Sequence, residues 1–224
     1  MTEVFGKNQG IARNSGHMAW RGLTDGAGVV VPWFQALILE GYGFTTQFGA
    51  ADLEDTDPGT FGAGGVDLTE FDMLQTLPAN GSVGIIPIYF KPILEAIGTI
   101  AAVDILLAYG SGGVIGANSV ANTAKNLRPD SNIATACTIA SLGDAAGTTL
   151  SMANGGYIWR EGTTALTGAS TNNAPMFGEW SAMKHGNAPV IVGASRQVAA
   201  YVSAQASTGY VHYQWIEMPN EYFD

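Results

Sequence analysis

Two consecutive apolar runs in the middle of the chain constrain its fold most strongly. The first, residues 83–97, is rich in β-branched and aromatic residues, and Pro87 and Pro92 exclude a long helix there. The same prolines predict an edge strand or a bulge. The second, residues 99–109, is apolar at nearly every position, which predicts a strand covered on both faces. We therefore expect an all-β domain built around these two runs.

Shorter strand-like runs, separated by turns rich in Gly, Asn, Ser and Pro, occupy much of the remaining chain. They lie at residues 44–48, 66–75, 133–142, 157–161, 177–183 and 189–193. The last two runs, residues 197–206 and 210–218, alternate in polarity and predict a β-hairpin of two long strands. Pro32 favours one short helix over residues 33–40. Together, about eight to ten strands with long connections predict a jelly-roll-like β-sandwich with one short helix.

The beginning of the chain predicts a different kind of structure. Residues 1–28 contain several turn signals, yet Phe5 and Trp20 lie among few charges, which is unusual for a free tail. We interpret residues 1–28 as an extended N-terminal arm that lies on its own domain or on a neighbour. Residues 29–224 then form a single β-sandwich domain.

Charge is sparse and mostly negative. Charged residues make up 12 % of the chain, about half the usual share, so neighbouring chains are expected to cover much of its surface. The net charge of −10 argues against direct nucleic-acid binding, which requires clustered Lys and Arg. Neither a signal peptide nor an apolar stretch long enough to cross a membrane is evident, so we expect a product made in the cytoplasm without membrane contact.

The sequence contains none of the familiar enzyme motifs. The run Gly110-Ser-Gly-Gly113 departs from the nucleophile elbow, because no helix is expected after it. The single cysteine, Cys137, fits a small buried residue better than a nucleophile. A hydrolase would require His185 or His212 beside an acid in a pocket, and nothing in the sequence singles out such a group. We therefore expect no catalytic, cofactor-binding or metal-binding residue.

Two groups of carboxylates leave alternatives open. Residues 52–58 carry four carboxylates in a loop, which would suit calcium, although their spacing departs from the EF-hand pattern and a solvated acidic loop is the simpler interpretation. They belong to a longer segment, residues 40–72, that has eight acidic residues and no basic one. Glu161 and Glu179 lie beside Trp159 and Trp180, which could mark a glycan-binding face, although buried tryptophans are more common.

The chain as a whole resembles bacteriophage virion proteins built on a single jelly roll. The likeness lies in the irregular opening from Lys7 through Trp20-Arg-Gly22, the strand pair 83–109, the turn at 126–130 and the closing hairpin that ends in Trp215-Ile-Glu-Met-Pro219. It implies a structural protein of the virion that forms or decorates a capsid by packing against copies of itself, as trimers or larger assemblies, and against other capsid proteins. The alternative is a carbohydrate-binding or adhesin-like module of a phage tail or fibre.

Overall fold

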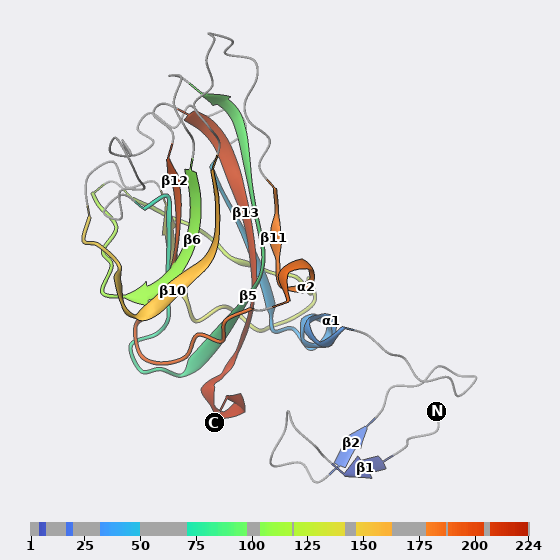
Figure 1. Ribbon diagram of the computed structural model, residues 1–224. Helices are drawn as coiled ribbons and strands as arrows, with labels where there is room; N and C mark the ends of the chain where they lie inside the picture. Colours follow the sequence, from blue (N-terminus) through green and yellow to red (C-terminus); the bar gives the residue numbers. More distant parts are fainter. Residues whose placement is uncertain are drawn as a thin grey trace.

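The protein is a β-sandwich with little helix, as the sequence predicts. The computed structural model describes residues 5–7, 17–19, 32–49, 71–97, 104–117, 119–141, 147–162, 178–186, 188–203 and 207–223. Two antiparallel sheets face each other, and a third, two-stranded sheet lies apart from them (Figure 1).

The first large sheet has five strands in the order β11-β5-β13-β3-β8. These strands are β11 (Trp180–Ser181), β5 (Val83–Ile97), β13 (Ser207–Pro219), β3 (Gly43–Gly49) and β8 (Lys125–Asn126). Strand β13 pairs with β5 along its whole length, and the register shifts next to Pro87. The bulge predicted from the prolines is therefore present, although β5 lies between two strands and not at the sheet edge.

The second large sheet has six strands in the order β10-β6-β12-β4-β9-β7. They are β10 (Ser151–Gly162), β6 (Asp104–Ser111), β12 (Arg196–Ser203), β4 (Met73–Thr76), β9 (Thr138–Ser141) and β7 (Val120–Ala121). From β3 to β6, and again from β10 to β13, consecutive strands belong to alternate sheets.

The main core lies between the two sheets. Alternate residues of β13 point into it, so Val211, Tyr213 and Trp215 are buried against residues of the opposite sheet such as Leu107 and Val198. Trp215 stacks on Tyr213, at a centroid distance of 5.3 Å, and on Phe44 at 5.8 Å. This aromatic stack fixes which face of the five-stranded sheet is buried.

Both sheets are also apolar on parts of their outer faces. On the six-stranded sheet, Leu106 and Tyr201 belong to a second buried cluster, which confirms that β6 is covered on both faces. On the five-stranded sheet, Ile86 and Ile216 belong to a third cluster, against which the helix α1 (Trp33–Leu39) packs through Leu37.

Helix α1 begins directly after Pro32, as predicted, and ends through a glycine. Gly41 has a φ of +91°, a left-handed conformation that suits glycine at a helix C-terminus. A Cβ atom at Gly41 would also clash with the Ser131 hydroxyl oxygen. This glycine therefore permits both the turn into β3 and the close approach of the 131–137 loop.

Four local predictions are wrong. The predicted strand 189–193 is limited to a single bridge between Ile191 and Ile85. The predicted hairpin does not form, because β12 and β13 belong to opposite sheets. The predicted strand 177–183 contains only Trp180–Ser181, because the Ser181 hydroxyl caps a turn of helix, α2 (Ala182–His185), by accepting a hydrogen bond from the Lys184 amide. Strand β9 begins at Thr138 and not near Ile133, since backbone and side-chain groups just before it bind a buried carboxylate instead of a neighbouring strand.

Within the predicted arm, β1 (Phe5–Lys7) and β2 (His17–Ala19) pair antiparallel and form the two-stranded sheet. The other residues of the arm lie outside the described part of the chain, as do residues 50–70, which include the acidic loop. At the other end, the short 3-10 helix η1 (Asn220–Tyr222) follows β13.

Candidate functional site

The most distinctive surface of the sandwich is an apolar one around α1. The side chains of Trp33 and Leu39 on α1 are 45 % and 44 % exposed, and Tyr222 of η1 is 37 % exposed. Val190 and Val192, which precede β12, are exposed as well. We call these five residues the α1 surface.

The third apolar cluster supports three members of the α1 surface, namely Trp33, Tyr222 and Val192. Trp33 packs edge-on against Phe34, and Tyr222 lies 6.4 Å from the Tyr42 ring, so both reach partly buried members of this cluster. Gly84 lies between Val192 and Phe223, as the position of its missing Cβ atom shows. These three side chains are thus the exposed margin of a packed group on the outer face of the five-stranded sheet. Figure 1 shows α1 beside this sheet and η1 after the C-terminal end of β13.

A buried carboxylate joins this end of the sandwich to the 131–137 loop. Glu217 of β13 points between the sheets and is only 4 % exposed. Its Oε1 accepts a hydrogen bond of 2.6 Å from the Ala136 amide, and its Oε2 accepts one of 2.6 Å from the Thr135 hydroxyl and one of 3.3 Å from the Trp215 indole. Three neutral donors therefore satisfy the charge, with no cation among these partners in the described residues. The arrangement is that of a structural joint.

Cys137 lies beside this joint and is buried, as the sequence predicts. Burial raises the pKa of its thiol far above the ordinary value, and nearby Glu217 raises it further, while Thr135 and Gln75 act in the opposite direction. A thiol held in its neutral form makes a poor nucleophile.

The histidines do not converge on a catalytic group in the described residues. The His185 ring stacks on Trp180, and its Nδ1 lies 3.2 Å from the Ser181 carbonyl oxygen. His212 lies on the outer face of the five-stranded sheet, with Nε2 2.9 Å from the Thr45 hydroxyl, and its partial burial lowers its pKa. His17 is on β2, and its side chain is outside the described part. No group of three or more His, Cys, Asp or Glu side chains in that part could hold a metal ion.

The two glutamates considered for glycan chemistry have structural partners. Glu161 accepts a hydrogen bond from the Gly178 amide, and Glu179 accepts one from the Tyr89 hydroxyl at 3.0 Å. That hydrogen bond is the main reason why the pKa of Glu179 is lowered. Trp180 is buried, and Trp159 packs against the main core. Both tryptophans therefore contribute to the core and do not form an exposed glycan-binding face.

The glycine-rich run after β6 is also structural. The Gln197 side chain accepts a hydrogen bond of 2.7 Å from the Gly113 amide and donates one of 2.8 Å to its carbonyl oxygen. Ser111 is paired within the sheet, and the chain continues as loop and not as helix. A nucleophile elbow is therefore excluded here.

Sequence reasoning did not identify Glu217, Gln197 or the α1 surface. A signal for Glu217 was present, because the alternation that places Trp215 inward also places Glu217 inward. No comparable signal marked the exposed face of α1, which depends on how far the helix covers the sheet.

Comparisons with known proteins give no family or relative. No family model, no curated protein and no solved structure matches the chain. In the part of the chain that the structure describes, no helix is both long enough and apolar enough to span a membrane.

Proposed function

We propose that this chain is a structural protein of the virion that forms or decorates a viral capsid by packing against copies of itself and against other capsid proteins. The observation that carries the proposal is the α1 surface. Exposed Trp33 and Tyr222 side chains are costly on a monomer but typical of interface cores, where Trp and Tyr are enriched and charged residues depleted.

The strand order supports this assignment. In the five-stranded sheet, β3-β13-β5-β11 are neighbours, and in the six-stranded sheet β4-β12-β6-β10 are neighbours. The alternation of these eight strands between two sheets supports a jelly roll, an architecture used by viral capsid proteins and also by lectins and cupins. The architecture alone does not choose among these functions, so the choice depends on the surfaces.

The surfaces favour assembly over glycan recognition. The tryptophans that pointed to a sugar-binding face, Trp159 and Trp180, contribute to the core. By contrast, Trp33 and Tyr222 of the α1 surface each pack against an aromatic ring of the third cluster, and such contacts lower the entropy that these side chains lose on docking. In a symmetric shell the same weak contact is repeated many times, so a modest apolar surface is sufficient for each copy.

The proposal is tested by introducing charge into the α1 surface. The double variant Trp33→Asp/Leu39→Asp should abolish species larger than the monomer in size-exclusion chromatography with light scattering, because it would bury two unpaired carboxylates at each contact. Val114→Asp/Val120→Asp is the matched control, since both valines are exposed, Val120 on β7 of the six-stranded sheet and Val114 shortly after β6 of the same sheet. Equal loss of large species in both variants, or equal retention, would contradict the assignment of this surface.

A further inference from the structure

The outer face of the five-stranded sheet carries cross-strand rows of polar side chains beyond the apolar cluster. One row is Lys91–His212–Gln47, on β5, β13 and β3. The next row is Tyr89–Gln214–Thr45–Lys125, on β5, β13, β3 and β8. Because Val211, Tyr213 and Trp215 point inward, the residues between them point outward. We call these seven residues the lysine face.

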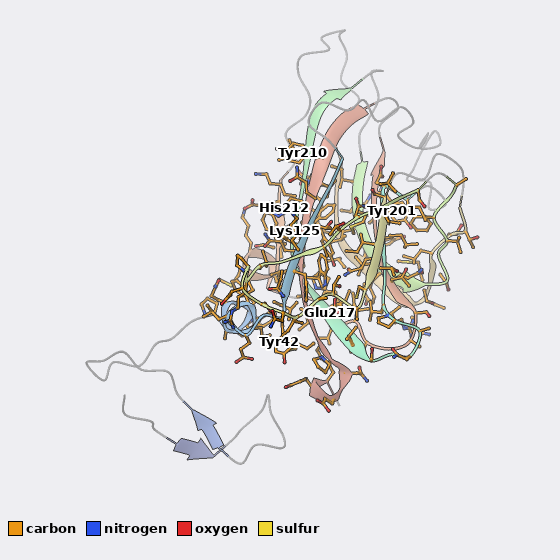
Figure 2. The ribbon with its side chains drawn as sticks, turned by 180° about the vertical axis from the view of Figure 1, so that it is seen from behind. Tyr42, Lys125, Tyr201, Tyr210, His212 and Glu217 are labelled. Carbon is orange, nitrogen blue, oxygen red and sulfur yellow. The ribbon has the colours of Figure 1, made fainter. Side chains whose placement is uncertain are left out.

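Contacts between the rows hold the lysine face together. The Thr45 hydroxyl lies 2.9 Å from His212 Nε2, and Gln214 Nε2 lies 3.2 Å from the same atom. The Tyr89 ring meets the His212 ring edge-on at a centroid distance of 5.6 Å. Figure 2 labels His212 and Lys125, which lie close together on this face, with Tyr210 farther along β13. The face is therefore a preorganised set of hydrogen-bonding groups.

Positive charge collects on the lysine face although the chain is strongly acidic. The sequence has nineteen Asp and Glu against nine Lys and Arg. Lys91 and Lys125 both lie on this face, and Lys184, on α2, lies at its margin. Glu179, which accepts the Tyr89 hydrogen bond, pairs with Lys184 at 3.6 Å. Within the described residues, neither Lys91 nor Lys125 has a carboxylate within 4.0 Å. Lys91 acts on Glu179 only over a longer distance, where it helps to lower the pKa of that carboxyl. In the described part of the chain the charges of Lys91 and Lys125 are therefore not neutralised by an ion pair, and they can attract an acidic partner.

The acidic part of the same sequence provides a partner of matching charge. Residues 40–72 contain eight acidic residues and no basic one, and Asp52, Glu54, Asp55 and Asp57 stand within six positions. We propose that the lysine face binds the acidic segment 52–58 of a second copy of this chain. This inference rests on the proposed assembly function and adds to it a second, polar contact between copies.

The contact would set the orientation and selectivity of assembly more than its strength. Ion pairs at an interface margin steer encounter and reject wrong pairings, and salt screens them. The α1 surface is apolar and insensitive to such screening. An assembly that uses both contacts should therefore weaken, but not vanish, as ionic strength rises.

The test reverses charge on the lysine face of the full-length chain. Lys91→Glu/Lys125→Glu should raise the concentration at which light scattering shows half-assembly by about tenfold or more. Arg160→Glu/Arg196→Glu makes the same change in net charge on the six-stranded sheet and should assemble as the wild type does. Changing Asp52, Glu54, Asp55 and Asp57 to lysine in the Lys91→Glu/Lys125→Glu background should restore assembly.

The outcomes separate this inference from the proposed function. If the wild type assembles and Lys91→Glu/Lys125→Glu assembles equally well, the inference is overturned and the assembly function stands. Loss of assembly without rescue by the reversed acidic segment also overturns it. If the lysine variants assemble normally but lose binding to immobilised heparin, the face serves an acidic polysaccharide instead. A wild type that remains monomeric at every concentration refutes the proposed function, and this inference with it.

Discussion

Removing the buried carboxylate of Glu217 should destabilise the sandwich by an amount that follows from its three hydrogen bonds. In Glu217→Met, the Ala136 amide, the Thr135 hydroxyl and the Trp215 indole lose their acceptor. A buried donor without a partner costs about 1–3 kcal/mol, while removing a buried charge returns part of that cost. We expect a loss of about 3–5 kcal/mol in the free energy of unfolding, a large part of the total for a domain.

Glu217→Gln should cost less, about 1–3 kcal/mol, because its remaining oxygen can still accept from the Ala136 amide and the Thr135 hydroxyl can turn to accept from the new amide. Glu221→Gln, at an exposed position of η1, is the matched control and should stay within about 0.5 kcal/mol of the wild type.

Urea unfolding gives the overall change, and amide hydrogen exchange at Ala136 and Cys137 reports the joint itself. Local exchange should rise in both Glu217 variants, even if Glu217→Met is too unstable for an equilibrium measurement. The reasoning is refuted if both variants match the wild type in stability and in the protection of these amides.

Three further predictions concern single residues. Gly41→Ala should lose more stability in thermal unfolding than Gly112→Ala, because both glycines have positive φ but only at Gly41 would the new Cβ meet a neighbour, the Ser131 hydroxyl; equal losses would contradict this explanation. Burial lowers the pKa of His212, so the unfolded chain gains that proton first as pH falls, and stability should decline below about pH 6.5, less so in His212→Gln; identical pH profiles in urea unfolding would contradict it. Cys137 should react with a thiol reagent at pH 8 far more slowly than a free thiol until urea unfolds the chain, and rapid labelling of the folded chain would exclude its burial.

The sequence predicts the elements of this fold better than their partners. Strand β13 is found almost entirely from its alternation, because its inward residues form the centre of the core. The strands with which β13 pairs could not be predicted in the same way. The short link between β12 and β13 suits a hairpin equally well, and only the competition for β5 and β3 on one side, and β6 and β4 on the other, places them in opposite sheets.

Local side-chain chemistry accounts for the other differences. At residues 177–183 the sequence alternates as a strand does, yet the Ser181 cap turns the chain into α2 after two paired residues. The α1 surface could not be predicted, because the exposure of Trp33 depends on which residues of α1 pack against the third cluster. Lys91 and Lys125 are far apart in the sequence, and only the strand register brings them to one face. The lysine face therefore could not be recognised from the sequence.

The mass of the full-length chain in solution tests the central claim most directly. Sedimentation velocity from about 1 to 100 μM, a range that spans the affinity of moderate interfaces, should show species of at least three copies growing with concentration. A single boundary at the 23.3 kDa of one chain across that whole range would contradict the claim that this surface is built to be covered by other copies.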